Sequence, residues 1–491
     1  MPDLDHKMDI KSEEVEEAVG VGTVTHAPSE AMSNRIKRTF DRRLLPIVCC
    51  LYVLSYLDRG NIGNAKIAGL NVDLYLSDSQ WAWVLNAFYI CYVCFEWTTV
   101  LWKIFPAHIY IACLCVLWGT AAACSGAVTN LAELIVCRSL LGIFEAAFGA
   151  GAPYFLSLFY KRKELGFRVS ILLGMSPLAN CFASALAYGL TQIRGSLRPW
   201  QYLFIIGRIP LCSHRAASSP IANETFLEGV PTVAFSLVVY FFLADSPGSA
   251  KYLTEEEQRY AIERLQVVDR TKKSGMKWSQ VFAGITDYQN YMHTLMHFCC
   301  NYSFAGLSNF LPTIVKDMGY SSIHAQGLTA PVYFAAFLLC VVVAIASDRY
   351  GKRGYIVSGF ACIGVVGYAL LIVGRETPIR YAGVWLAACG VYPALCINIT
   401  WLLNNQGGDS KRGAGLAILA TFGQCSSFMS SVGVSIGCAL TALIVILSLT
   451  LHFLLERENG RRDREYGPVG SDTTVDVTEE GDKNRDFRYL T

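Results

Sequence analysis

Residues 328–347 read LTAPVYFAAFLLCVVVAIAS, a run without a charged side chain, and Asp348 follows it directly. An α-helix rises about 1.5 Å per residue, so this stretch is long enough to cross a hydrocarbon core roughly 30 Å thick. A segment surrounded by lipid has to satisfy its own backbone hydrogen bonds, and a helix does so. The stretch therefore predicts a transmembrane helix.

Apolar stretches of similar length recur through most of the chain. Of the 491 residues, 53% are hydrophobic and only 16% are charged, whereas soluble proteins carry roughly a quarter of charged residues. This composition predicts an all-α membrane protein with twelve transmembrane helices in two six-helix halves. The predicted spans are residues 44–64, 81–101, 108–128, 131–158, 166–191, 200–243 (interrupted), 288–315, 328–347, 354–374, 381–403, 412–431 and 434–455.

A long polar segment separates the first six predicted spans from the last six. Two six-helix units form a known transporter design, in which the substrate site lies between the halves near the middle of the membrane. The first 30 residues are acidic and contain no basic stretch ahead of an apolar core, so no cleavable signal peptide is expected. The predicted organisation is a tail (1–43), a first half (44–244), a linker (245–287), a second half (288–455) and a second tail (456–491).

Basic residues gather in the loops on one side of the predicted membrane. The positive-inside rule places the side with the excess of Lys and Arg in the cytoplasm. We therefore expect a multi-pass protein, in the plasma membrane, with both termini cytoplasmic. The residues that carry this excess are Arg35, Lys37, Arg38, Arg42, Arg43, Lys161, Arg162, Lys163, Arg168, Arg349, Lys352, Arg353, Lys411, Arg412, Arg457, Arg461, Arg462 and Arg464.

Residues 207–226 interrupt the sixth predicted span. They are rich in Ser, Arg, Pro and His, and without them one span of suitable length would remain. A translated intron and a genuine extracellular insertion both explain such a segment. The sequon at Asn223 would be a glycosylation site on the outer side, whereas the sequons at Asn301 and Asn398 lie inside predicted spans.

Charged side chains inside the spans are the candidates for a functional site, because burying a charge in a membrane is costly. The first span holds Asp58, Arg59 and Asn61, and the fourth holds Arg138 and Glu145 on one helical face. A buried guanidinium stays charged and can grip a carboxylate through two hydrogen bonds. A partly buried carboxyl group can load and release a proton near neutral pH. Together these groups permit anion binding to be coupled to proton movement.

Structural roles remain open for the same residues. The four charges also suit ion pairs that hold the first and fourth helices together, and Asp58 alone suits a counter-charge for Arg59. In the second half, uncharged polar side chains are candidates to line the cavity or to form hydrogen bonds between helices. These are Asn301, Tyr302, Asn398 and Gln424.

The sequence gives little support to metal, cofactor or enzymatic functions. His293 and His297 have the i, i+4 spacing that suits zinc, but no third ligand accompanies them, so structural histidines are expected. The 18 Cys scatter through apolar spans, which favours small buried side chains over disulfides. The chain contains no P-loop, H-E-x-x-H or nucleophile elbow. We expect no metal, no cofactor and no nucleic-acid partner.

Three motifs point to a family. They are residues 57–65 (LDRGNIGNA), the pattern Arg138-x3-Gly142-x2-Glu145 that ends at Pro153, and the loop at 348–353 (DRYGKR). They resemble the major facilitator superfamily and, more narrowly, its anion:cation symporter family in the fungal branch of allantoate and nicotinate permease-like proteins. The resemblance covers roughly residues 35–460 and implies the major facilitator fold and transport by alternating access.

The resemblance also implies roles for individual residues. Arg59 and Arg138 would grip the anion, and Asp58 and Glu145 would carry protons. The remaining residues of the expected substrate site are Asn61, Tyr302, Asn398 and Gln424. The expected gate loop consists of Asp348, Arg349, Gly351, Lys352 and Arg353, whereas the equivalent loop of the first half, at 102–108, has lost nearly all of that pattern.

The leading hypothesis is proton-coupled uptake of a small organic anion, a carboxylate such as a vitamin, ureide or organic acid, by a monomer. Efflux of a carboxylated secondary metabolite is the alternative, since the same fold supports it. Uptake that rises at acidic outside pH would favour the first hypothesis, and product retained inside knockout cells would favour the second. The substrate stays open, because Arg recognises the carboxylates of all these compounds alike.

Overall fold

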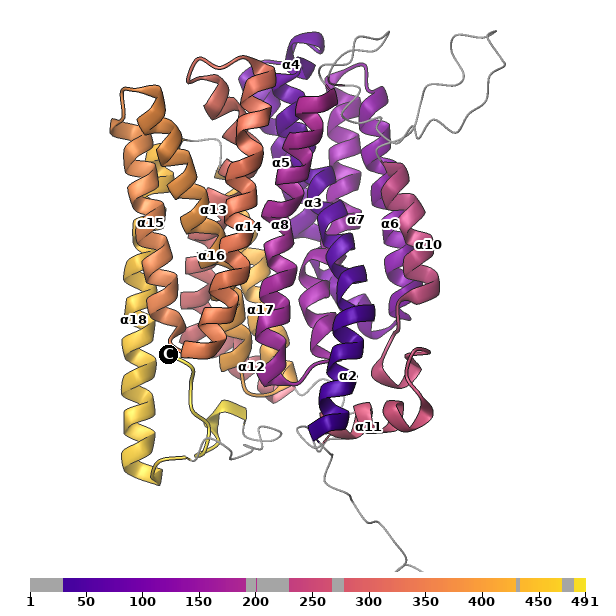
Figure 1. Cartoon of the computed structure of the whole chain (residues 1–491), viewed down its shortest axis with the longest axis vertical. Coiled ribbons are helices and arrows are strands. Elements are labelled where there is room, and N and C mark those ends of the chain that lie inside the picture. The colour runs from indigo at the N-terminus through magenta and orange to yellow at the C-terminus, as the bar shows by residue number, and fades with distance from the viewer. Residues whose placement is uncertain (1–29, 191–199, 201–228, 267–277, 430–432, 470–480) are drawn as a thin grey trace, which may run out of the picture.

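The structure, a computed structural model, describes residues 30–190, 200, 229–266, 278–429, 433–469 and 481–491 (Figure 1). Every regular element within these residues is a helix. Each predicted span corresponds to a described helix, although only the second part of the sixth span is described. The all-α prediction is therefore confirmed, whereas the predictions on 207–226 and Asn223 fall outside the described residues.

The twelve helices that correspond to the predicted spans form two sets of six in chain order. The first half comprises α3 (Leu45–Ile67), α5 (Asp78–Phe95), α6 (Ala107–Cys124), α7 (Leu131–Ser157), α8 (Arg162–Leu190) and α10 (Gly229–Phe242). The second half comprises α13 (Tyr288–Lys316), α14 (Ser322–Tyr350), α15 (Arg353–Val373), α16 (Thr377–Asn405), α17 (Asp409–Gln424) and α18 (Val434–Tyr466).

Two helices are longer than predicted, because hydropathy marks the lipid boundary and not the end of a helix. α14 begins at Ser322, where the Ser321 side chain caps it by accepting a hydrogen bond from the His324 amide. α18 continues to Tyr466, and Arg461 forms ion pairs of 2.7 and 2.8 Å with Glu458 and Glu465 on the exposed part of the helix. Such i, i+3 and i, i+4 pairs stabilise a helix outside the lipid.

Three other spans change from α-helix to 3-10 helix before they end, and one of them is α6, which passes into η2 (Ser125–Ala127). α5 passes into η1 (Glu96–Lys103), where the Thr98 hydroxyl donates a hydrogen bond of 2.6 Å to the Phe95 carbonyl. A side chain that bonds its own backbone in this way competes with the regular helical ladder. α17 similarly passes into η4 (Cys425–Met429).

Short helices mark the two ends of the bundle. α2 (Glu30–Arg43), α11 (Glu255–Gln266) and α12 (Trp278–Thr286) lie at the lower end in Figure 1, which we call the α2 end. α4 (Leu70–Asp73) lies at the opposite end, which we call the α4 end.

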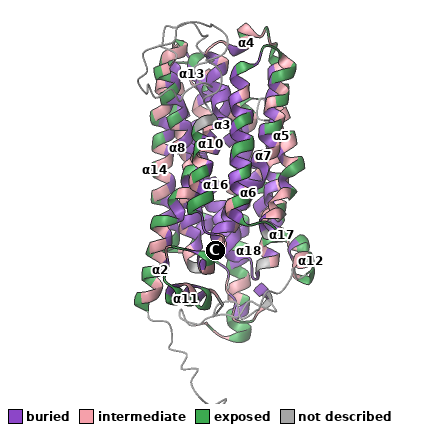
Figure 2. Ribbon diagram, turned by 90° about the vertical axis from the view of Figure 1, so that its right-hand side faces the viewer, coloured by how far each residue is buried: buried purple, intermediate pink, exposed green. Residues whose placement is uncertain are grey.

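The outer surface of the bundle suits contact with lipid. Figure 2 shows buried residues on the inner sides of the helices and more exposed ones on the outer sides. Large apolar side chains are exposed there, including Val342 on α14 and Ile446 on α18, which are 60% and 62% exposed. Among the described helices, six are long and apolar enough by themselves to cross a membrane, namely α6, α8, α14, α15, α16 and α18.

The two halves pack against each other mainly through α8 with α14 and α16, and through α3 with α13. The Asn309 amide on α13 donates to the Tyr89 hydroxyl on α5 at 3.1 Å. Beside it, the Asn180 amide on α8 donates to the Tyr392 hydroxyl on α16 at 3.2 Å, and its oxygen accepts from the Ser308 hydroxyl of α13 at 3.3 Å. Side chains of both halves therefore meet around the site described next.

Candidate functional site

The centre of the candidate site is an ion pair between α3 and α7. The Arg59 guanidinium donates a hydrogen bond of 2.7 Å to Glu145 Oε1. The Arg59 side chain is 5% exposed and that of Glu145 is not exposed at all. The Ser55 hydroxyl, one turn before Arg59 on α3, donates to the same carboxylate oxygen. The first and fourth spans thus meet through the two motifs that the sequence analysis selected.

Aromatic rings enclose the Arg59 guanidinium. Its central carbon lies 4.5 Å from the ring centre of Tyr56, 4.9 Å from that of Phe88 and 5.0 Å from that of Tyr92. A cation is attracted to the face of an aromatic ring, most strongly where water is excluded. The rings therefore help to keep the guanidinium charged inside the bundle and hold it in place.

Asp58 does not pair with Arg59, although the two are adjacent in sequence. Adjacent residues on a helix point in directions about 100° apart, and Asp58 faces α10, where the Thr232 hydroxyl donates to it at 3.3 Å. Arg138 and Glu145 both lie within electrostatic reach of Asp58. Asp58 as a simple counter-charge of Arg59 is therefore wrong for this conformation, because Glu145 occupies that position.

The second half contributes a row of aromatic rings opposite Arg59. Tyr56 meets Phe304 of α13 edge to face with the ring centres 5.8 Å apart. Phe304 in turn meets Tyr392 of α16 at 5.2 Å, and Tyr392 meets Tyr333 of α14 at 6.2 Å. Sequence analysis missed this row, because an aromatic residue in an apolar span carries no signal that distinguishes it from ordinary packing.

The polar residues predicted for the second half are buried but largely engaged with their own half. The Tyr302 hydroxyl donates to the Gly433 carbonyl at 2.9 Å. Asn398 uses both groups on His293, since its oxygen lies 2.8 Å from Nδ1 and its amide donates to the His293 carbonyl at 3.1 Å. Asn61 is buried on α3, and Gln424 is half-buried at the end of α17. The hydrogen-bonding alternative thus describes Asn398 in this conformation.

Glu96 adds a third buried carboxyl group, at the start of η1. It is 6% exposed, faces the Thr421 hydroxyl of α17, and lies within electrostatic reach of Arg59. It therefore joins the first half to the second through α17.

Two residues of the expected gate loop reach the interface between the halves, since Asp348 accepts from the Phe167 backbone of α8 and a Cβ at Gly166 of α8 would lie 3.1 Å from Arg353 Nη2. The Arg353 guanidinium, 2% exposed, donates through Nη2 to Asp348 at 2.7 Å and, with the Asn404 amide oriented to accept, to the Asn404 oxygen at 2.9 Å. Gly351 ends α14 with a φ of +69°, a conformation that favours glycine. Arg349 is exposed, and the Lys352 ammonium lies 6.0 Å from the Tyr355 ring of its own half.

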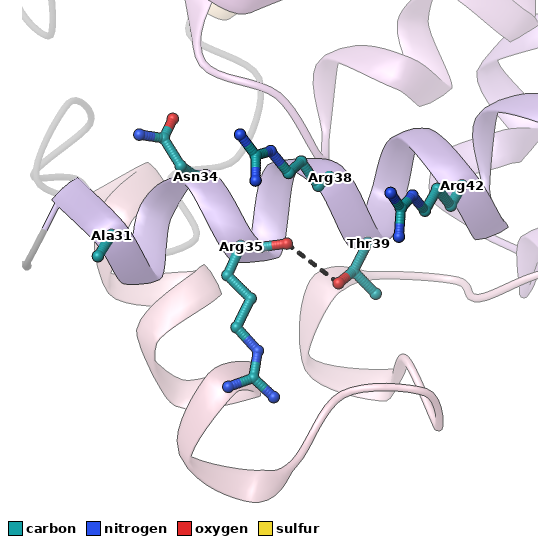
Figure 3. A pocket seen from close by; sticks show the side chains of 6 residues that line it. All are labelled: Ala31, Asn34, Arg35, Arg38, Thr39 and Arg42. Atoms are coloured by element: carbon teal, nitrogen blue, oxygen red, sulfur yellow. Dashed lines mark hydrogen bonds between the residues drawn. The ribbon is translucent and has the colours of Figure 1, made fainter.

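Figure 3 shows a hollow that is separate from the candidate transport site. That hollow, about 650 Å³, lies on the surface of α2. Its lining residues are Ala31, Asn34, Arg35, Arg38, Thr39 and Arg42. Across the part of the chain that the structure describes, no group of three or more His, Cys, Asp or Glu side chains is placed to hold a metal ion.

Comparisons with known proteins agree with this architecture. The family model described as Major Facilitator Superfamily matches residues 48–211 and 224–431. The chain is 29% identical over 485 residues to the high-affinity nicotinic acid transporter of Saccharomyces cerevisiae, covering 94% of this chain and 86% of that protein. It is 26% identical over 493 residues to the major facilitator-type transporter hxnP of Emericella nidulans, covering 95% of each.

Solved structures show the same fold. A structure of the proton:xylose symporter XylE covers 86% of this chain and 96% of its own, with a TM-score of 0.60 at 14% identity. A bacterial homologue of the lysosomal transporter Spinster, in an inward-facing conformation, covers 84% of this chain with a TM-score of 0.55 at 13% identity.

Proposed function

Because this chain belongs to the Major Facilitator Superfamily and is a multi-pass membrane transporter, we propose that it takes up a small organic anion together with protons. The observation that carries the proposal is the buried ion pair of Arg59 with Glu145. A fully buried ion pair adds little to the stability of a protein, because the free-energy cost of taking both charges out of water offsets their attraction. The pair joins two helices of the first half, but it lies beside the interface, where Tyr56 meets Phe304 of the second half, and this position supports a role in transport.

In the proposed coupling, Glu145 and the carboxylate of the substrate compete for the Arg59 guanidinium. When Glu145 takes up a proton, it loses its charge and its hold on Arg59 weakens. Arg59 is then available to bind the carboxylate of the substrate, which replaces Glu145 as the acceptor. Proton and anion therefore load together, and the site cannot bind the anion firmly while Glu145 remains ionised.

Asp58 and Arg138 form the second proposed charge pair of the site. Both are 2% exposed, and Arg138 is within electrostatic reach of Asp58. We assign Arg138 to anion binding and Asp58 to proton binding, with Asn61, Tyr302 and Gln424 as polar contacts of the substrate. Asn398 can take part only if its contact with His293 opens.

The aromatic surroundings favour a planar carboxylate as substrate. The Tyr56 ring lies against the Arg59 guanidinium and meets Phe304 edge to face, and ring faces stack on flat, unsaturated molecules. A nicotinic acid transporter among the relatives is consistent with a small aromatic acid. The α2 end is taken to be cytoplasmic, and the protein to be a plasma-membrane monomer.

The test is uptake of labelled monocarboxylates, aromatic and aliphatic, by cells that express the protein. Uptake of a substrate should increase when the outside pH is lowered from neutral, and Arg138→Ala should abolish it. Arg457→Ala is the matched control, because Arg457 is exposed at the far end of α18. Uptake that does not depend on pH and is unchanged in the Arg138→Ala variant would contradict the mechanism. Export of the labelled acid would favour the efflux hypothesis.

A further inference from the structure

The last residues of the chain pack against helices of the second half at the α2 end. We call residues 481–491 the tail segment; its end lies beside α18 in Figure 1. Phe487 is 1% exposed and Tyr489 is 7% exposed, so the segment is packed into the protein. The Asp482 carboxylate lies 2.7 Å from the Lys411 ammonium at the start of α17.

Two asparagine side chains bind the backbone of the tail segment, and each both accepts and donates a hydrogen bond. Asn405 of α16 accepts from the Leu490 amide and donates to the Leu490 carbonyl, both at 2.8 Å. Asn459 of α18 accepts from the Tyr489 amide at 2.9 Å and donates to its carbonyl at 2.8 Å. Trp401 adds a third bond to Leu490, from its indole nitrogen to the carbonyl at 2.7 Å.

The side chain of Tyr489 forms a hydrogen bond within the tail segment. Its hydroxyl donates to Asp482 at 2.9 Å. Burial raises the pKa of the Tyr489 phenol, and the nearby Asp482 carboxylate raises it further, so the phenol stays protonated and can donate. The segment is therefore held at both ends, by Lys411 near its start and by α16 and α18 near its end.

The same turn of α16 carries a contact between the two halves. The Thr400 hydroxyl lies 2.9 Å from that of Ser170 on α8, and Asn404 accepts from Arg353. Gly166, one turn before Ser170, packs against Arg353 and Thr400. A Cβ at Gly166 would lie 3.1 Å from Arg353 Nη2 and 3.1 Å from Thr400 Cγ2. We call these five residues the α2-end gate.

Helical spacing links the tail segment to the gate. Thr400 and Asn404 are i and i+4 on α16 and face the first half, whereas Trp401 and Asn405 are the next i, i+4 pair and face the tail segment. One helical turn is therefore held between the gate on one side and the tail segment on the other. Any movement of this turn changes both sets of contacts.

We propose that the tail segment is a strap that holds this turn of α16 where it closes the α2-end gate, with Trp401 and Asn405 as the positioning residues. The groups that bind the strap belong to α13, α16, α17 and α18 of the second half, whereas the gate joins α16 to the first half. The strap thus favours the conformation that is closed at the α2 end, and its release favours opening there.

Two native thiols provide a readout that does not depend on the substrate. Cys396 lies one turn before Thr400 and is 1% exposed, and its sulfur is 3.9 Å from that of Cys340, which is fully buried. A Cβ at Gly174 of α8 would lie 3.3 Å from Cys340, so the thiols sit directly behind the gate. They react with an alkylating reagent when the gate opens.

The experiment measures alkylation of Cys396 and Cys340 by peptide mass spectrometry on the protein in lipid nanodiscs. A chain without residues 481–491 and the full-length Asn405→Ala and Asn459→Ala variants should react at least about fivefold faster, the factor that corresponds to the net loss of one ordinary hydrogen bond. Arg485→Ala is the matched control, since that side chain is 75% exposed and contacts only its neighbour Asp486. Thr400→Val opens the gate directly and is the positive control.

A structural role of the tail segment alone would give a different pattern. Adding a synthetic peptide of residues 481–491 to the shortened protein should restore slow alkylation, and a scrambled peptide should not. Equal alkylation rates in the wild-type, shortened and Asn405→Ala proteins, with a faster rate in Thr400→Val, would overturn the proposal. So would faster alkylation that merely follows a lower melting temperature and is not reversed by the peptide. Neither outcome bears on anion uptake.

Discussion

Arg59 has more partners than its neighbours in sequence suggest. Glu145 accepts from Arg59 and from Ser55, and Tyr56, Phe88 and Tyr92 surround the guanidinium. Such a pair can serve transport, or it can hold α3 and α7 together, and both roles predict that a single substitution is harmful. The two roles differ in what happens when both charges are removed.

Glu145→Gln alone should destabilise the protein by about 3–5 kcal/mol, because Arg59 is left as an uncompensated buried charge. The double variant Arg59→Gln with Glu145→Gln should recover most of that stability, since neither charge remains. We expect it to stay inactive in uptake, because no guanidinium is left to bind the anion. Melting temperature and uptake by the same preparations measure the two effects.

The control for this pair is Glu456→Gln, since Glu456 is 55% exposed on α18. It should change neither stability nor uptake. If the double variant regained uptake along with stability, the pair would be a structural link between α3 and α7, and the proposed mechanism would be wrong at this residue.

Among the helices, the proposed α2-end gate depends on the pairing of α8 with α16. The two helices approach closely at Gly166, where Arg353 and Thr400 occupy the space of a side chain. A protein interior is packed too tightly to absorb a large side chain at such a contact without movement. The gate therefore depends on the absence of a side chain as much as on hydrogen bonds.

Gly166→Leu should hold the α2-end gate apart. Overpacking costs about 1–3 kcal/mol, which would shift the ratio of closed to open molecules by roughly five- to 150-fold. Uptake should fall accordingly, while the amount of protein in the membrane stays the same. Gly359→Leu is the matched control, because nothing lies within 4 Å of a Cβ at Gly359. Normal uptake by Gly166→Leu would show that α8 and α16 need not approach closely.

For the whole molecule, the two halves form one bundle whose membrane-facing surface is apolar and whose interface is polar and aromatic. The interrupted sixth span is the one place where the chain departs from twelve continuous apolar spans. If residues 207–226 derive from a retained intron, a chain without them should fold and transport at least as well as the full chain. If they are a genuine insertion, their removal is not expected to improve folding or transport.

Expression of both forms in the same cells tests this prediction. The measurements are the yield of monodisperse protein and the uptake of the monocarboxylate panel. Transport by the full chain alone would contradict the intron interpretation, as would a transcript that encodes residues 207–226 as the single species.

The sequence by itself determined the helices and the candidate charges, because a membrane allows few solutions. Lipid requires helical spans, as at 328–347, and makes every buried charge conspicuous, so Arg59, Arg138 and Glu145 could be found from the sequence. The helix ends of α14 and α18 and the 3-10 turn at Glu96 could not, since they depend on caps and ion pairs outside the hydropathy signal.

Only the tertiary structure decided which groups meet. It pairs Arg59 with Glu145 across 86 residues, not with the adjacent Asp58, because neighbours on a helix face different helices. It brings Tyr56 and Phe304 together from opposite halves, and it places the last residues of the chain against Asn405. Contacts between segments far apart in the sequence depend on how helices are packed, and hydropathy and spacing carry no information about that.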